Sequence, residues 1–295
     1  MALDYRYNYS DEELQEDWRR LCTTTTYKTG AQFKPGMKLC QHFCPNFWDI
    51  QSENGQSFAK AWQDPQIMDR VRQWGLEGMS QLWLSWVRRA VYMAAGLPNS
   101  SFYRPHFSKQ IIEMSGKLRG TLFDPCAGWG GRMLGTVASG WDYYSCEPNV
   151  ETWNNLQRML SFIRPQSVVD IACIPVELYS IESIRPDVVL TSPPYFNLEV
   201  YASDSGQSYV THNNYEAWRD NWLLPLIRRC LSVLPQDGIS AWNVMNFKRY
   251  ALVEDVVEEH RKHGWILTAT VGFQSPLANI RATKNKDVTY VFRRA

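Results

Sequence analysis

The chain has 295 residues, enough for one large α/β domain or for a catalytic domain with a smaller companion. Hydrophobic residues make up 44% of the chain and charged residues 21%, values that exclude a disordered, collagen-like or coiled-coil protein. The 31 Lys and Arg against 30 Asp and Glu leave a formal charge of +1, so the total charge gives no argument for a nucleic-acid partner, although a local basic face could be hidden in it.

The cysteines and the N-terminus indicate the compartment. The seven Cys residues are scattered without the spacing of a disulfide framework. Apolar runs are shorter than the roughly 20 residues that a membrane span needs. Residues 1–17 lack the basic and apolar regions of a signal peptide. We therefore expect a cytoplasmic protein with reduced thiols.

The N-terminal third is expected to be mainly helical or irregular. Residues 1–60 are broken by Gly and Pro, and one short helix is predicted over 11–21, with Ser10 and Glu13 forming a capping box. A second helix is predicted over 79–97, where apolar residues recur at helical spacing. This stripe consists of Met79, Leu82, Trp83, Trp86, Val87, Ala90, Val91 and Ala94. We expect its tryptophans to pack in the core rather than form a binding platform, and Arg88 and Arg89 to lie off the stripe.

From about residue 104, short apolar runs alternate with helical patterns. Strands are predicted over 118–124, 141–146, 168–174, 187–190, 239–246, 266–273 and 288–293. Helices are predicted after residue 131 and over 150–163, 215–234 and 252–263. Such alternation predicts an α/β fold whose mostly parallel sheet is covered on both faces, with the last two strands as an antiparallel pair at one edge.

Two features follow the first two strands. The glycine-rich run DPCAGWGG at residues 124–131 lets the backbone approach a ligand closely, and the helix after it offers N–H groups to an anion. Its spacing is not that of a dinucleotide motif, so NAD is a poor fit. Glu147 directly follows the second strand, where a carboxylate can accept both hydroxyls of a ribose or simply start a helix.

A third feature is the sequence TSPPYF at residues 191–196, directly after the strand predicted over 187–190. The two prolines make a rigid, extended exit from the strand and remove two backbone donors. Backbone carbonyls there and the Ser192 hydroxyl can accept hydrogen bonds from an amino group. Tyr195 offers a flat face on which a planar ring can stack. A Pro-Pro turn is common, but this position in such a fold is much more specific.

The two motifs, in this order, resemble those of Rossmann-like S-adenosylmethionine-dependent DNA amino-methyltransferases, a class I methyltransferase fold. DPCAGWGG is similar to their cofactor motif D-P-x-x-G-x-G, and TSPPY to their catalytic motif [D/N/S]-P-P-[Y/F]. FYRP at 102–105, followed by Ile111 and Ile112, resembles the segment that folds back over the cofactor. The resemblance covers about residues 102–295. We expect residues 101–295 to form the methyltransferase domain and residues 1–100 to form an N-terminal extension available for substrate recognition.

The resemblance implies S-adenosylmethionine as the cofactor and assigns the site residues. Cofactor binding falls to Tyr103, Asp124, Cys126, Gly128, Gly130 and Glu147. Catalysis falls to Ser192, Pro193, Pro194 and Tyr195. Ser192 and the Pro193 carbonyl would hold the protons of an aromatic amine, and Tyr195 with Phe196 would stack on a flipped-out base. The chemistry needs no metal.

The substrate has several candidates. A Ser in the catalytic motif is typical of enzymes that methylate cytosine N4 in DNA, with adenine N6 as the second choice. RNA, a protein glutamine, and a nucleic-acid-binding module without turnover remain alternatives. The loop over 274–286 carries Arg281, Lys284 and Lys286, which we expect to contact phosphates. Residues 197–214 are expected to close over the substrate as a lid or to form a solvated loop.

The chain between the two motifs is long enough only for the fold itself, so no separate target-recognition domain fits there. Recognition is then expected from residues 1–100, from loops or from a partner. Within those residues, Cys40, His42 and Cys44, with Cys22 upstream, raise the question of a zinc site. The spacing is not the usual C-x2-C and no second pair stands nearby, so buried thiols are the preferred interpretation.

Overall fold

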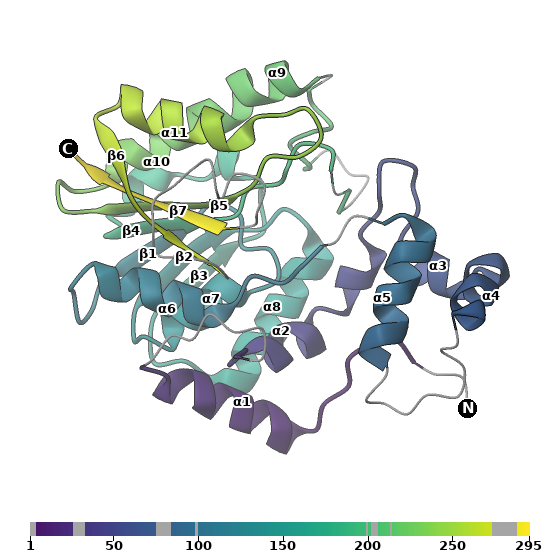
Figure 1. The fold of residues 1–295 in the computed structure, drawn as a ribbon. Coiled ribbons are helices and arrows are strands. Elements are labelled where there is room, and N and C mark those ends of the chain that lie inside the picture. Colours follow the sequence, from purple (N-terminus) through teal and green to yellow (C-terminus); the bar gives the residue numbers. More distant parts are fainter. Residues whose placement is uncertain are drawn as a thin grey trace.

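The computed structural model describes residues 4–25, 33–74, 84–97, 100–198, 200–201, 206–212, 214–272 and 288–295. Within them lies a seven-stranded sheet of order β3-β2-β1-β4-β5-β7-β6 (Figure 1). The strands are β1 (Thr121–Asp124), β2 (Asp142–Cys146), β3 (Val169–Ala172), β4 (Val188–Thr191), β5 (Ile239–Val244), β6 (Trp265–Val271) and β7 (Val288–Arg294). Strands β1 to β5 pair in parallel, and β7 pairs antiparallel with both β5 and β6. This is the predicted mostly parallel α/β arrangement, with the antiparallel pair at one edge.

Helices cover both faces of the sheet (Figure 1). One face carries α6 (Pro105–Met114), α7 (Gly131–Val137) and α8 (Val150–Ile163), and the other carries α9 (Tyr215–Trp218), α10 (Leu224–Val233) and α11 (Leu252–Lys262). Successive side chains of a strand point to opposite faces of the sheet. In β1, Leu122 packs in the cluster under α6 to α8, and Phe123 packs in the cluster under α10 and α11. All four residues of β4 are buried, as a central parallel strand requires.

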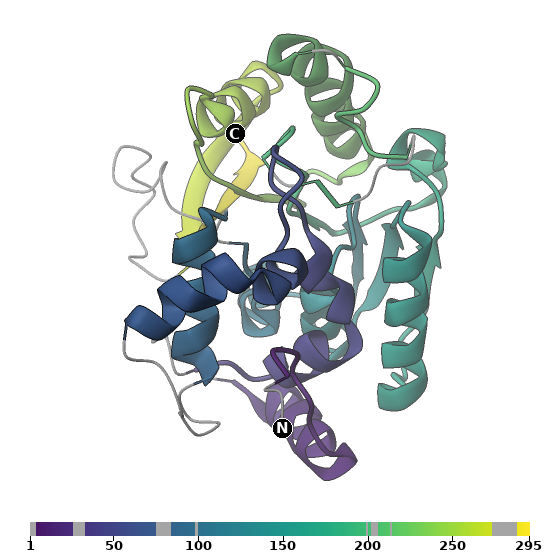
Figure 2. The same ribbon diagram turned by 90° about the vertical axis from the view of Figure 1, so that its right-hand side faces the viewer.

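The N-terminal region contains more helix than predicted. It consists of α1 (Asp11–Thr23), α2 (Met37–Phe43), a 3₁₀ turn (Pro45–Asp49), α3 (Phe58–Gln63), α4 (Pro65–Gln73) and α5 (Leu84–Ala95). The predicted capping box is present, with Ser10 Oγ accepting from the Glu13 N–H. The prediction that residues 1–60 are largely irregular is wrong, because short helices form between their Gly and Pro residues. Figure 2 shows these helices, purple to blue, in front of the sheet.

The predicted core role of the tryptophan stripe is wrong where the structure tests it. Trp86 on α5 is 55% exposed, whereas Val87 and Val91 are buried. Arg88, predicted to lie off the stripe, is only 9% exposed. Its guanidinium donates to the Tyr5 carbonyl at 2.7 Å and lies 3.9 Å from the centre of the Tyr7 ring, so its burial is compensated. Met79, Leu82 and Trp83 lie outside the described residues.

Two predicted elements differ in extent. The first strand was predicted from Leu118, but Leu118 is 94% exposed and β1 begins at Thr121. The helix predicted over 215–234 is present, but its middle is a π-helical turn over Arg219–Leu223 between α9 and α10. No helix within the described ranges is long and apolar enough to span a bilayer.

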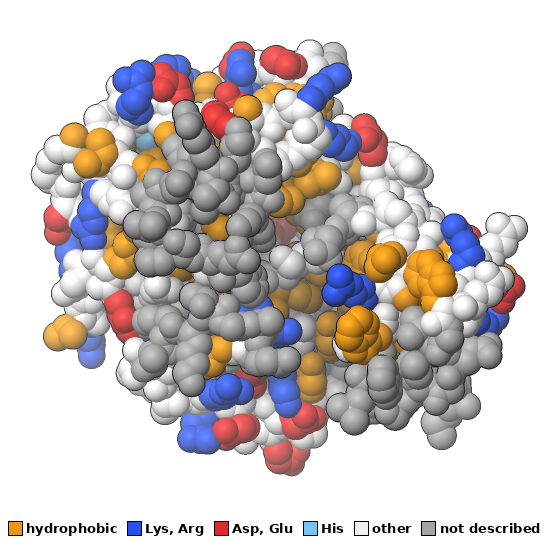
Figure 3. All heavy atoms as spheres, in the orientation of Figure 1, with side chains coloured by type: hydrophobic (Ala, Val, Ile, Leu, Met, Phe, Trp, Pro, Cys, Tyr) orange, Lys and Arg blue, Asp and Glu red, His pale blue; other side chains and the backbone are white. Residues whose placement is uncertain are grey.

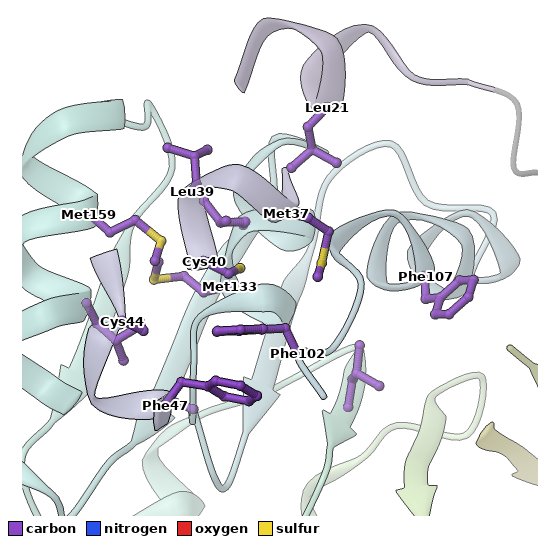
Figure 4. Close-up of a cluster of buried hydrophobic side chains, with 14 of the residues drawn as sticks. Leu21, Met37, Leu39, Cys40, Cys44, Phe47, Phe102, Phe107, Met133 and Met159 are labelled. Carbon is purple, nitrogen blue, oxygen red and sulfur yellow. The ribbon is translucent and has the colours of Figure 1, made fainter. Parts of the chain in front are cut away.

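The N-terminal helices share one apolar core with the sheet domain (Figure 4). Leu39 and Cys40 from α2 pack beside Met133 of α7 and Met159 of α8. Phe47 stacks on Phe102 with 4.2 Å between the ring centres. The two parts are therefore packed as one body.

Polar groups also join the N-terminal helices to the sheet domain. The Asn46 side chain donates to Thr152 Oγ1 at 2.8 Å and accepts from Asn155 Nδ2 at 2.9 Å, with all three residues buried. Lys109 Nζ on α6 donates to the Leu21 carbonyl at 2.9 Å. Buried polar groups that are paired in this way fix one docking geometry, because any displacement would leave them unsatisfied.

Cys40 and Cys44 are fully buried in this apolar cluster (Figure 4). Burial raises the pKa of the Cys40 thiol well above its ordinary value, which favours the neutral thiol over a metal-binding thiolate. The His42 ring has a hydrogen-bond partner, since its Nδ1 accepts from the Tyr9 N–H at 3.5 Å. No group of three or more His, Cys, Asp or Glu side chains in the described ranges is placed to hold a metal ion.

Candidate active site

One large cavity, of about 800 Å³, lies at the carboxyl ends of the central parallel strands. The glycine-rich turn after β1, Glu147 after β2 and Ser192 to Tyr195 after β4 all line it. The strand order reverses between β1 and β4, and in open α/β sheets ligands bind at such a point. Two motifs that are far apart in the sequence therefore meet in one cavity.

Asp124 lies beneath the cavity rather than in its wall. Its carboxylate is fully buried and accepts from Arg132 Nε at 2.7 Å and from the Tyr143 hydroxyl at 2.8 Å. Burial raises the pKa of this carboxyl, while Arg132 opposes the shift. Arg132 also donates to the carbonyls of Cys126 and Ala127. Asp124, which we predicted as a cofactor ligand, thus holds the turn through Arg132, and the cavity wall is made by Cys126 and Gly128.

The glycines of the turn are required by its shape. Gly128 and Gly130 have φ of +55° and +77°, a left-handed conformation that side chains rarely adopt. A Cβ on Gly131 would stand 2.1 Å from the Tyr103 carbonyl oxygen, so only glycine fits at this crossing. The turn and the segment around Tyr103 are consequently in direct backbone contact, and Tyr103 lines the cavity with Gly128 and Gly131.

Glu147 presents a partly desolvated carboxylate to the cavity. Its side chain is 8% exposed, and its two oxygens accept from the Gly128 and Asn149 N–H groups, each at 3.0 Å. Burial raises the pKa of this carboxyl to about 7, against the lowering effect of these two hydrogen bonds. Each oxygen retains a lone pair, so a pair of hydroxyls can still donate to Glu147.

The segment from Ser192 to Tyr195 forms another part of the wall. The Tyr195 ring stacks on Phe247 with 6.1 Å between centres and 21° between planes, and its hydroxyl donates to the Asn243 carbonyl at 3.3 Å. Ser192 Oγ accepts from Asn243 Nδ2 at 3.5 Å. Phe196, which we predicted to contact substrate, has φ of +47° and is 5% exposed.

The side chain of Phe196 turns away from the cavity. It packs against the rings of Trp218 and Tyr215, in the layer under α9. Tyr195 and Leu198 line the cavity, but Phe196 does not. The other predicted substrate contacts, Arg281, Lys284 and Lys286, lie outside the described residues.

Several residues of the wall were not predicted. Asn243 and Asn246 lie at the carboxyl end of the parallel strand β5. Ligands of open α/β sheets bind at the carboxyl ends of the strands, so the argument that places Glu147 in the site also places these two residues there. Gln207 and Ser208 also line the cavity and are buried, and Ser208 Oγ accepts from Trp218 Nε1 at 3.0 Å. Residues 206–208 thus belong to the cavity wall, within the segment predicted to form a lid or a solvated loop.

The N-terminal region reaches the same end of the sheet. Gln51 and Val200 exchange backbone hydrogen bonds of 3.0 and 2.9 Å. Glu53 pairs with Lys248 at 2.5 Å and accepts from Asn197 Nδ2 at 3.1 Å. Residues 51–53 therefore lie directly beside the chain that leaves the catalytic motif. Across the described part of the face in Figure 3, Lys and Arg are interspersed with Asp and Glu, in agreement with the near-zero total charge.

No protein-family model and no curated protein matches the sequence. Solved structures do match the fold. One is a precorrin-6y C5,15-methyltransferase from Geobacter metallireducens, with 10% identity over 66% of this chain and 90% of that chain and a TM-score of 0.42. Another is a ribosomal protein L11 methylase from Lactobacillus delbrueckii, with 12% identity over 68% and 82% and a TM-score of 0.42. A third is an rRNA methylase from Streptococcus thermophilus, with 12% identity over 66% and 99% and the same TM-score of 0.42. At these identities the chemistry must be inferred from the site itself.

Proposed function

We propose that this protein transfers a methyl group from S-adenosylmethionine to the exocyclic amino group of a nucleic-acid base, with cytosine N4 in DNA as the first candidate. One observation carries the proposal: the glycine-rich turn with Glu147 and the motif Ser192 to Tyr195 line one and the same cavity. Residues 101–295 are then the methyltransferase domain, and residues 1–100 contribute to recognition.

The residues present fit the cofactor. The cavity volume of about 800 Å³ is within the range of small-molecule sites and has room for a nucleoside and a second planar group. Glu147 supplies two acceptor oxygens for the ribose hydroxyls, and the glycine turn lets backbone approach closely. When bound, the cofactor supplies an electrophilic methyl group on a sulfonium.

The catalytic wall fits an aromatic amine. The lone pair of such an amine is delocalised into its ring, which makes the nitrogen a poor nucleophile. Ser192 Oγ and the Pro193 carbonyl would accept hydrogen bonds from the two amine N–H groups and favour a tetrahedral nitrogen with a localised lone pair, and one of these protons leaves the nitrogen when the methyl group is bound. Tyr195, whose ring packs on Phe247, would stack on the target ring and hold the amine in place.

The substrate assignment rests on this aromatic wall. A flat ring beside the amine acceptors favours a planar base over the flexible side chain of a protein glutamine. Arg281, Lys284 and Lys286 remain our proposed phosphate contacts. Adenine N6 and RNA are the runner-up substrates.

The test is to incubate the full chain and labelled S-adenosylmethionine with DNA, RNA and protein, then to digest each and identify the modified unit. We expect N4-methylcytosine in DNA. Label on adenine N6 or in RNA would support methyl transfer to an amino group but contradict cytosine in DNA as the substrate. Label only in protein would refute the nucleic-acid assignment. Bound cofactor without any transfer would indicate a binding module.

A matched pair of variants tests the role of the motif. Ser192→Ala should lower kcat about 100-fold and leave the cofactor affinity unchanged, because it removes one acceptor of the amine. Ser183→Ala, on an exposed turn outside the cavity, should have wild-type kcat. Equal kcat for Ser192→Ala and the wild type would contradict the assigned mechanism.

A further inference from the structure

Asn243 connects the catalytic motif to the neighbouring strand β7. Strands β5 and β7 pair antiparallel with Asn243 directly opposite Thr289, so their side chains lie next to each other on one face of the sheet. Thr289 Oγ1 donates to Asn243 Oδ1 at 3.1 Å. Thr289 is fully buried and Asn243 is 7% exposed, so water does not compete for this contact. Asn243 lines the cavity, whereas Thr289 lies behind it.

The protons of this group can be assigned by elimination. Asn243 Oδ1 is only an acceptor, so the single hydroxyl proton of Thr289 is donated to it. The Tyr103 hydroxyl, 3.1 Å from Thr289 Oγ1, must then donate to Thr289. With Oδ1 held by Thr289, the amide of Asn243 presents its N–H group to Ser192 Oγ at 3.5 Å.

The direction of the last hydrogen bond determines what Ser192 offers to substrate. Asn243 Nδ2 cannot accept, so the Ser192 proton does not point at Asn243. One lone pair of Ser192 Oγ is occupied by Asn243, so the other lone pair and the hydroxyl proton remain for groups in the cavity, which Ser192 lines. If the Asn243 amide were reversed, Ser192 would donate its proton to Oδ1, and that proton would be lost to the cavity.

Asn243 also contacts the other end of the motif. Its backbone carbonyl accepts from the Tyr195 hydroxyl at 3.3 Å, while its side chain donates to Ser192. The two prolines between Ser192 and Tyr195 have no N–H groups and cannot anchor the motif by their own donors. One residue on β5 therefore holds both ends of the catalytic motif.

We propose that Thr289 is a positioning residue that orients the Asn243 amide and, through it, the Ser192 hydroxyl toward the target amine. This inference rests on the proposed amino-methyltransferase function. Thr289 acts on the reaction without lining the cavity. Its loss should impair the chemical step more than the binding of either substrate.

The test uses two substitutions of nearly equal shape. Thr289→Val removes the hydroxyl and keeps the volume, and Thr289→Ser keeps the hydroxyl. For methyl transfer to the modified base identified above, we expect Thr289→Val to lower kcat about tenfold, with KM and the cofactor dissociation constant within about twofold of wild type. Thr289→Ser should recover kcat to within about threefold of wild type.

A second readout does not depend on activity. The side-chain amide of Asn243 gives a pair of ¹H–¹⁵N signals, assigned by their loss in Asn243→Asp. In Thr289→Val these signals should broaden or shift because the amide is no longer held, and in Thr289→Ser they should stay near the wild-type position.

The outcomes separate the two proposals. Wild-type kcat in Thr289→Val, or an equal loss in Thr289→Ser, overturns the positioning role even when the wild type methylates DNA. A wild-type protein that transfers no methyl group overturns the proposed function. In that case an unchanged Asn243 signal in Thr289→Val also overturns the orientation of the amide by Thr289, and a changed signal supports it.

Discussion

The proposed cofactor role of Glu147 predicts that cofactor affinity depends on pH in the neutral range. Burial raises the pKa of this carboxyl from 4.5 to about 7, although the Gly128 and Asn149 N–H groups oppose the shift. The ionised form accepts hydrogen bonds from two ribose hydroxyls, and the protonated form loses one acceptor position and its charge. We therefore expect the cofactor to bind mainly to the ionised form.

The size of the effect follows from this pKa. With a value of about 7, roughly nine-tenths of the molecules are ionised at pH 8 and roughly one-tenth at pH 6. If only the ionised form binds, the dissociation constant rises about tenfold from pH 8 to pH 6 and stays flat above pH 8. Isothermal titration with S-adenosylhomocysteine, the methyl-free product, measures this constant without turnover.

Two variants isolate the carboxylate. Glu147→Gln should bind more weakly at pH 8 and lose the pH dependence, which also controls for titrating groups on the ligand. Glu177→Gln removes a charge from an exposed residue of the same cavity and should keep the wild-type profile. Equal wild-type dissociation constants at pH 6 and pH 8, or a pH dependence that survives in Glu147→Gln, would refute the reasoning.

The same carboxyl affects folding in the opposite direction. A raised pKa in the folded state means that Glu147 favours folding below pH 4.5 and that this contribution is lost as the pH rises through about 7. At 1.36 kcal/mol per pH unit, the cofactor-free protein loses about 3 kcal/mol of unfolding free energy over that range from this group. We therefore expect lower stability of the cofactor-free protein and tighter cofactor binding at high pH. Both effects have one cause, the buried charge of the Glu147 carboxylate, which the ribose hydroxyls of the cofactor would hydrogen-bond.

Two further predictions concern the frame of the site. Gly131→Ala should abolish cofactor binding and lower Tm by several degrees, because its Cβ would meet a backbone carbonyl at 2.1 Å. Gly140→Ala, with open space around its Cβ, should lower the unfolding free energy by only about 1 kcal/mol, because of its positive φ. Similar losses of stability in both variants would contradict the predicted clash at Gly131. Asn46→Ala should lower the unfolding free energy by about 2–3 kcal/mol, since it removes the hydrogen-bond partner of two buried groups on α8, Thr152 Oγ1 and Asn155 Nδ2. Asn154→Ala on the exposed face of α8 should stay within about 0.5 kcal/mol in a urea titration.

The sheet and its order of motifs could be predicted because local patterns determine them. Fully buried strands such as β4 appear as continuous apolar runs, and helices such as α8 show their period and their Asn149 cap directly in the sequence. Ligands of open α/β sheets bind at the carboxyl ends of the strands, and this regularity is enough to place Glu147 and Ser192 in one cavity.

The N-terminal errors have a tertiary cause. Helical periodicity assigned Trp86 to the core and Arg88 to the surface, and the structure reverses both. Arg88 is buried because its guanidinium contacts the Tyr5 carbonyl and the Tyr7 ring. These partners are 83 and 81 positions away, so the local pattern around Arg88 carries no sign of them. Phe196 is a similar case, since its positive φ and its packing on Trp218 and Tyr215 belong to the tertiary structure.

The support of Ser192 is the part of the site that sequence patterns could not supply. Asn243 and Thr289 are 46 positions apart and meet only because β7 inserts antiparallel between β5 and β6, in one particular register. A shift of that register by one residue would turn Thr289 to the other face and leave the Asn243 amide unheld. The motif from Ser192 to Tyr195 is readable in the sequence because it is local, whereas the hydrogen bonds that hold it depend on how the edge of the sheet is assembled.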